Sequence, residues 1–129
     1  LVISIAGNIL FSDIFLSKIV SLLPVPLNSS NITSSILLPV SISAVAIIVN
    51  DVPYLFDAGA GVWQATGAAT PKYGGTVKAL ESGNISKVFI THLHSDHDVG
   101  LPSLILLPWA LGREAPLEVW GPPGTENMV

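Results

Sequence analysis

The sequence predicts an α/β fold, and three observations support this prediction. Short apolar runs with the composition of β-strands alternate with longer segments that have a helical pattern. Turns that contain Gly, Pro, Asn or Asp separate these segments. Of the 129 residues, 50% are hydrophobic and only 11% are charged, which argues strongly against a disordered chain. The length suffices for one small domain.

The composition changes near residue 42, and we therefore divide the chain into two regions. Residues 1–42 are rich in Ser, Leu and Ile, and their only charged residues are Asp13 and Lys18. Prolines and polar residues interrupt the apolar stretches of this region, so none reaches the roughly 20 uninterrupted residues of a transmembrane helix. Residues 43–129 carry the alternating pattern. They are expected to be the amino-terminal part of a domain that is truncated at Val129.

The second region begins with a predicted β-hairpin. Residues 44–49 and 54–56 are apolar runs on either side of an Asn50-Asp51 turn. A glycine-rich loop over residues 57–61 follows, where small side chains allow close approach of the backbone. A helical stretch is expected from Val62.

Two further strands and one long helix are predicted after the hairpin. Residues 87–91 and 117–120 read as short strands. The run from residue 101 to 111 is apolar on nearly all sides, which predicts a buried helix that is bent or ended near Pro108. Thr125 is expected to cap a helix that follows the last strand.

The chemistry concentrates in one segment, because all three histidines of the chain lie between Thr91 and Asp98. Side chains two apart in an extended segment point to the same side, so His92 and His94 can face one metal ion. Asp96 and His97 follow a bend and can face a second position, as in two-metal sites with ions about 3.5–4 Å apart. The pattern predicts a dinuclear metal site.

The identity of the metal follows from the available ligands. The chain has no cysteine, so the ligands are nitrogen and oxygen atoms, a set that favours Zn²⁺, with Mn²⁺ and Fe²⁺ as alternatives. The competing interpretation is a group of surface histidines without a ligand, or a single structural metal site. The strand before the cluster and the helix after it favour the hydrolytic site.

Three more residues are assigned to the surroundings of this site. Asp57 either braces the ligand loop through hydrogen bonds or forms a turn after its strand, and we favour bracing. Asp98 either supports a metal ligand or serves as a helix N-terminal residue favoured by the helix dipole, and we favour the second role. Gly100 is assigned to backbone geometry.

Residues 91–97 followed by Gly100-Leu-Pro102 resemble the His-x-His-x-Asp-His signature of metallo-β-lactamase-fold hydrolases, in the form found in ribonuclease Z and its arylsulfatase-like relatives. Segments 54–61, 87–91 and 118–125 resemble the same subgroup. The resemblance implies roughly the first half of an αββα sandwich.

The resemblance also implies a ligand set and a reaction. His92 and His94 would bind the first zinc ion, and Asp96 and His97 would bind the second. Asp96 would also orient or deprotonate the attacking water, which hydrolyses a phosphodiester or ester bond. The remaining ligands of the family would lie beyond Val129, so this chain alone is expected to be inactive.

The substrate is not fixed by these motifs. Ribonuclease Z cuts precursor tRNA at its 3′ side, whereas the arylsulfatase-like members hydrolyse small esters, and the family implies a homodimer. The first function would place the protein in the cytoplasm, and the second would place it in the periplasm or outside the cell. The net charge of −4 gives no basic patch for RNA. A third hypothesis is a non-catalytic fragment with a residual metal site.

The resemblance is weakest in the first region. The family has a Gly-Thr-Gly-Thr-Pro turn where this chain reads Leu23-Pro-Val-Pro-Leu27. We hypothesise that residues 1–42 are divergent or partly read in a shifted frame. The coding DNA tests this hypothesis, which fails if no other frame restores the glycines.

Overall fold

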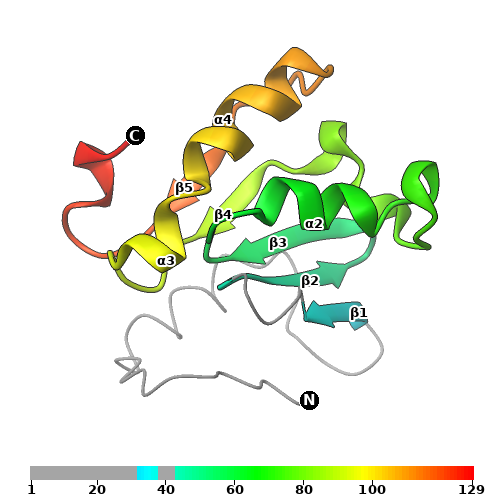
Figure 1. Cartoon of the computed structure of the whole chain (residues 1–129), viewed down its shortest axis with the longest axis horizontal. Coiled ribbons are helices and arrows are strands. Elements are labelled where there is room, and N and C mark those ends of the chain that lie inside the picture. The colour runs from blue at the N-terminus through cyan, green and yellow to red at the C-terminus, as the bar shows by residue number, and fades with distance from the viewer. Residues whose placement is uncertain (1–31, 38–42) are drawn as a thin grey trace.

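The structure, a computed structural model, describes residues 32–37 and 43–129, which form a five-stranded mixed sheet with helices (Figure 1). The antiparallel part consists of β1, β2 and β3, and the strands β3, β4 and β5 are parallel to one another. The α/β prediction is therefore confirmed. The hypotheses for residues 1–31 and 38–42 lie outside the described residues. The strands are, in order across the sheet, β1 (Ile32–Leu37), β2 (Val45–Val49), β3 (Val52–Phe56), β4 (Lys87–Phe89) and β5 (Glu118–Trp120).

The predicted hairpin is present as β2 and β3. Its turn residues Asn50 and Asp51 both have positive φ, at 49° and 63°. Two such residues in succession match the turn whose twist suits two antiparallel strands, and Asn and Asp tolerate this conformation better than other residues with a side chain. The turn aligns Val49 with Val52 and sets the register of the hairpin.

The helices α2 and α4 lie on the same side of the sheet in Figure 1. Ala46, Ile48, Leu55 and Val88 alternate along the central strands and form the core with the buried residues of these helices. Within the described residues, no helix has the length and apolar character needed to cross a membrane. The helical segments are α2 (Val62–Ala68), α3 (Ser95–Asp98) and α4 (Leu101–Ala110), with single 3₁₀ turns η1 (Pro71–Tyr73), η2 (Lys78–Leu80), η3 (Ser82–Asn84) and η4 (Thr125–Asn127).

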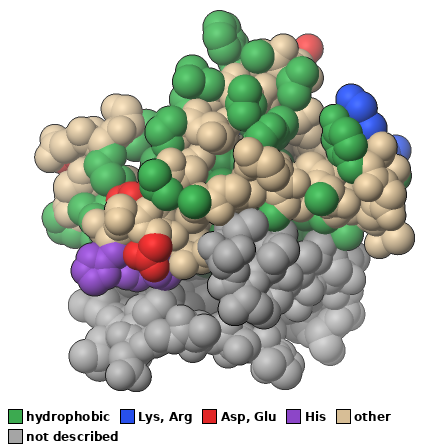
Figure 2. Space-filling model, viewed as in Figure 1, with side chains coloured by type: hydrophobic (Ala, Val, Ile, Leu, Met, Phe, Trp, Pro, Cys, Tyr) green, Lys and Arg blue, Asp and Glu red, His purple; other side chains and the backbone are tan. Residues whose placement is uncertain are grey.

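The expectation that the apolar helix after residue 100 is buried holds for one face of α4 only and is wrong for the other. Leu101, Leu104 and Pro108 are buried, whereas Leu106 and Trp109 are 57% and 69% exposed. Hydrophobic side chains accordingly gather on the surface over α4 (Figure 2). Composition cannot reveal this outcome, because an apolar helix buries only the face against which the rest of the chain packs.

Arg113 holds the end of α4. Pro108 has no N–H, so the carbonyl of Leu104 lacks its usual helical donor. Arg113 Nη1 donates to this carbonyl at 2.7 Å, and Nη2 donates to the Ile105 carbonyl at 3.0 Å. The same guanidinium donates to the carbonyls of Ala115 and Ile85 at 3.0 and 3.4 Å, which ties α4 to the segments before β5 and β4.

The opposite face of the sheet carries a row of aromatic rings. Phe89 is fully buried, and its ring centroid lies 4.7 Å from that of Trp120 and 5.2 Å from that of Phe56. Tyr54 is buried beside Phe89 at 6.4 Å. Burial raises the pKa of the Tyr54 phenol, with a smaller opposing effect of Lys87.

This raised pKa predicts a loss of stability at alkaline pH. The fold favours the neutral phenol, so the contribution is fully present below the ordinary pKa of about 10 and is lost as the pH rises through the raised folded value. Urea unfolding at pH 8 and pH 10.5 should show a smaller alkaline loss for Tyr54→Phe than for the wild type. Tyr73→Phe is the matched control, because that ring is 65% exposed. Equal alkaline losses for Tyr54→Phe and the wild type would contradict the prediction.

Candidate metal centre

The parallel strands bring three loops to one edge of the sheet. The carboxyl ends of β3, β4 and β5 point the same way, and ligand sites of open α/β sheets lie at such ends. Asp57 follows β3, the histidine segment follows β4, and the turn over residues 121–124 follows β5. β4 ends at Phe89 rather than at residue 91 as expected, because the N–H of Thr91 donates to a side chain instead of to a strand.

The structure brings the three imidazoles together. The ring centroid of His92 lies 4.6 Å from that of His94 and 4.0 Å from that of His97. His94 directly precedes α3 in an extended conformation, and α3 then turns the chain so that His97 faces back toward His92. Figure 2 shows the histidine side chains gathered at one end of the molecule beside acidic side chains.

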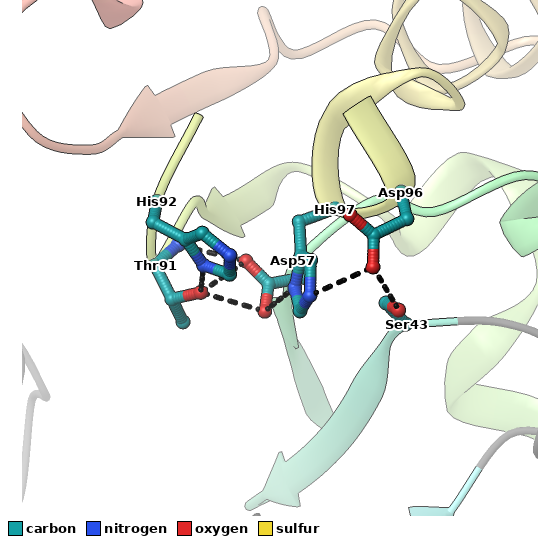
Figure 3. A network of polar contacts seen from close by, with 6 residues as sticks. All are labelled: Ser43, Asp57, Thr91, His92, Asp96 and His97. Carbon is teal, nitrogen blue, oxygen red and sulfur yellow. Dashed lines mark hydrogen bonds and ion pairs between the residues drawn. The ribbon is translucent and has the colours of Figure 1, made fainter. Parts of the chain in front are cut away.

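Asp57 is the most highly connected side chain of this edge (Figure 3). It is buried, and its carboxylate accepts the backbone N–H of Thr91 at 2.7 Å and the Thr91 hydroxyl at 2.8 and 2.9 Å. Its Oδ2 also lies 2.9 Å from His97 Nδ1. The backbone φ of Asp57 is 63°, a conformation that Asp tolerates and that turns the chain sharply after β3.

His97 lies between two carboxylates. Its Nδ1 faces Asp57, and its Nε2 lies 3.2 Å from Oδ2 of Asp96, which is also 3.5 Å from the Ser43 hydroxyl. A carboxylate only accepts hydrogen bonds, so Nδ1 carries a proton, and Nε2 of a neutral ring is then an acceptor that faces another acceptor. This contact is favourable only with a proton or another cation near Nε2 and Asp96.

The donor chemistry fits a divalent metal ion, but the described side chains do not form a closed site. Three imidazoles and one exposed carboxylate match the ligands that zinc prefers when sulfur is absent. Within residues 32–37 and 43–129, no group of three or more His, Asp or Glu side chains is arranged to hold a metal ion. The strongest indication of a cation is therefore the pair formed by His97 Nε2 and Asp96.

Two glycines allow the loop after β3 to pack directly against α3. The N–H of Ala58 donates to the His97 carbonyl at 2.6 Å, and the N–H of Gly100 donates to the Ala58 carbonyl at 2.7 Å. A Cβ atom on Gly100 would lie 2.3 Å from the Gly59 carbonyl oxygen, and a Cβ atom on Gly59 would lie 2.5 Å from the Asp96 carbonyl oxygen. Gly100 has an ordinary φ of −86°, so close packing rather than backbone conformation requires glycine there.

Two further residues were assigned roles from the sequence, Asp98 and Thr125. Asp98 is the last residue of α3, and its side chain makes no hydrogen bond or ion pair to another described residue. It borders a shallow apolar pocket with Val99 and Met128.

The expectation that Thr125 caps the final helix is wrong, because Gly124 takes the cap position with a φ of 104° and the Thr125 hydroxyl donates to the Pro122 carbonyl instead.

Sequence reasoning did not assign roles to Thr91 or Ser43, and it expected close backbone approach in the loop that contains Gly59 without naming the partner segment. Thr91 directly precedes the first histidine, which is the one local signal that could have drawn attention to it. Ser43 and Gly59 contact the site only through tertiary structure.

Comparison with known proteins shows what the chain is similar to. No family model matches the chain. Ribonuclease Z of Methanothermobacter thermautotrophicus is 35% identical over 75 residues, which is 58% of this chain and 22% of the relative. The crystal structure of human tRNase Z, short form (ELAC1), matches 67% of this chain with a TM-score of 0.56 and 33% identity. The chain is homologous to part of ribonuclease Z.

The homology is partial. Ribonuclease BN of Cronobacter sakazakii is 41% identical over 76 residues, and this chain again covers only 22% of that relative. The chain covers 30% of the human tRNase Z structure. The predicted resemblance and the partial metallo-β-lactamase fold are confirmed over this part. Human zinc phosphodiesterase ELAC protein 1 is also 41% identical over 54 residues, and none of these relatives supports the arylsulfatase alternative.

Proposed function

We propose that this chain contributes the first metal ligands of a zinc-dependent phosphodiesterase of the ribonuclease Z type. The ligands are His92, His94, Asp96 and His97. The observation that carries the proposal is the gathering of three imidazoles and Asp96 at the carboxyl edge of parallel strands, with His97 between two carboxylates. Homology to ribonuclease Z and to zinc phosphodiesterases supports it.

Each residue has a distinct role in this proposal. Bound zinc would supply Lewis-acid stabilisation of phosphate charge and a water of lowered pKa. Asp57 holds His97 and Thr91 in place, which orients the loop that carries the ligands. The Asp96 side chain is 68% exposed, so it can reach a water molecule as well as a metal ion and accept the proton of that water.

Precursor tRNA is the proposed substrate of the whole protein, and a homodimer is its proposed assembly. Relatives named ribonuclease Z and tRNase Z favour RNA over a small ester. The net charge of −4 gives this chain little electrostatic attraction for RNA. Because the chain covers about a fifth of its relatives, we propose that cleavage requires ligands and RNA contacts that this chain lacks.

Zinc binding tests the ligand assignment. The chain is dialysed against limiting zinc, and bound metal is measured by mass spectrometry. His92→Ala and His94→Ala should each lower bound zinc severalfold, because each removes one nitrogen ligand. Glu114→Ala is the control, since it removes an exposed carboxylate outside the cluster. Unchanged zinc content in both histidine variants would refute the assignment.

Cleavage assays test the activity. The natural gene product that contains this chain should cut a precursor tRNA at its 3′ side in the presence of zinc, and Asp96→Asn should abolish the cut. Hydrolysis of an aryl sulfate without any cleavage of precursor tRNA would overturn the substrate assignment and favour the small-ester alternative.

A further inference from the structure

We propose that Thr91 is a positioning residue that determines which nitrogen of His92 is available to a metal ion. This inference rests on the proposed function, because it treats His92 as a metal ligand. It goes beyond that function by assigning a role to a hydroxyl group that is not itself a ligand.

The Thr91 hydroxyl bridges a carboxylate and an imidazole (Figure 3). Its Oγ1 lies 2.8 and 2.9 Å from the two oxygens of Asp57 and 2.9 Å from Nδ1 of His92. The backbone N–H of Thr91 donates to the same Asp57 carboxylate. Both the backbone and the side chain of Thr91 are therefore hydrogen bonded to Asp57, and these contacts fix the position of the hydroxyl relative to the His92 ring.

The direction in which Thr91 donates its single hydroxyl proton determines the tautomer of the His92 ring. Asp57 is an acceptor only, and a hydrogen bond to a charged carboxylate is stronger than one to a neutral ring nitrogen, so the Thr91 hydroxyl donates to Asp57. The lone pairs of Oγ1 then face His92, whose Nδ1 must donate. The proton of the neutral His92 ring thus resides on Nδ1, and Nε2 keeps the free lone pair.

One buried carboxylate consequently determines which ring nitrogen carries the proton in two imidazoles. Asp57 accepts directly from Nδ1 of His97 and acts on Nδ1 of His92 through Thr91. Both rings then offer Nε2 to a cation, and their centroids are only 4.0 Å apart. Without the hydroxyl, His92 could adopt either tautomer, and only one of them presents Nε2 as a ligand.

The first test reads the proton position in the metal-free chain. Long-range ¹H–¹⁵N spectra of the imidazoles distinguish a proton on Nδ1 from one on Nε2. His92 should carry its proton on Nδ1 in the wild type and in Thr91→Ser, and should shift toward the Nε2-protonated form in Thr91→Val. His97 is an internal control, because it contacts Asp57 directly and should keep its tautomer in all three proteins.

Thr91→Val keeps the shape of the side chain and the backbone N–H that Asp57 accepts, and Thr91→Ser restores the hydroxyl alone. Circular dichroism must show that each variant is folded. If His92 keeps a proton on Nδ1 in a folded Thr91→Val, the proposal is overturned. If Thr91→Ser behaves like Thr91→Val, the hydroxyl is not the cause and the proposal is equally overturned.

The second test measures zinc affinity by competition with a chromophoric chelator. Loss of a group that orients a ligand typically weakens metal binding by about 10–100-fold. The zinc affinity of Thr91→Val should therefore be lower than that of the wild type by a factor in this range, whereas the affinity of Thr91→Ser should stay near the wild-type value. Unaltered affinity in Thr91→Val would overturn a role in metal binding. If the wild type binds no zinc although the tautomers change as expected, the proposed function fails while the control of His92 by Thr91 is supported.

Discussion

Replacing Gly100 with Ala is expected to lower the free energy of unfolding by about 3 kcal/mol, at the upper end of the usual effect of overpacking a tightly packed site. The new Cβ would lie 2.3 Å from the Gly59 carbonyl oxygen and 2.8 Å from the Ala58 carbonyl oxygen. Both are backbone atoms, and Ala58 is hydrogen bonded to α3 and to Gly100, so neither can move without displacing the loop. Urea denaturation measures the change.

The chain offers a matched control of opposite sign. Gly67 lies inside α2, and a Cβ atom there would meet no atom within 4 Å. Gly67→Ala should therefore stabilise the chain by roughly 0.5–1 kcal/mol, because glycine is a poor helix former. If Gly100→Ala were as stable as the wild type, α3 would not be packed on the loop as the structure shows. A folded Gly100→Ala should also bind less zinc, since α3 carries two proposed ligands.

Replacing Arg113 with Ala should cost roughly 3–5 kcal/mol of unfolding free energy, because buried carbonyls that lose their donor cost about 1–3 kcal/mol each. The guanidinium is buried, which lowers its pKa, and it donates to four carbonyls rather than to a carboxylate. The Leu104 carbonyl is the most affected, since Pro108 provides no N–H to replace the lost donor. The shift of the urea midpoint gives the magnitude.

Two further variants separate the geometry of Arg113 from its charge. Arg113→Lys keeps the charge but lacks the planar fork of donors, so it should recover only a small part of the loss. Lys78→Ala removes an exposed cation and should change stability by no more than about 0.5 kcal/mol. A full recovery of stability in Arg113→Lys would show that charge, and not the set of hydrogen bonds, explains the effect.

The parts of the fold that the sequence predicted are those with local signals. The hairpin follows from two apolar runs around Asn50 and Asp51, whose backbone conformation their side chains favour. The histidine segment is equally local, because its three rings lie within six residues. The proximity of these rings in the structure therefore requires only a strand end followed by one helical turn.

The parts that could not be predicted depend on contacts between distant segments. Bracing of the ligand loop by Asp57 was expected, but its partners Thr91, 34 residues away, and His97, 40 residues away, could not be named, because no local pattern encodes these pairs. The hydrogen bonds of Arg113 also follow from tertiary packing, as does the identity of the segment that approaches Gly59. The exposed face of α4 was predicted to be buried for the same reason, since the burial of a helix face depends on which other segments of the chain pack against it.

If zinc binds to the proposed ligands, the affinity of the chain for zinc and the stabilisation of its fold by zinc have different structural origins. Under the proposed ligand assignment, the short spacing of residues 92–97 keeps the three imidazoles at a high effective concentration in the denatured ensemble, so unfolded molecules would also bind zinc. A ligand that binds both states stabilises the native one only by the difference between its two affinities. In this proposal, the difference between the two zinc affinities would come from the contacts of Asp57 with Thr91 and His97, which form only when β3 and β4 pair.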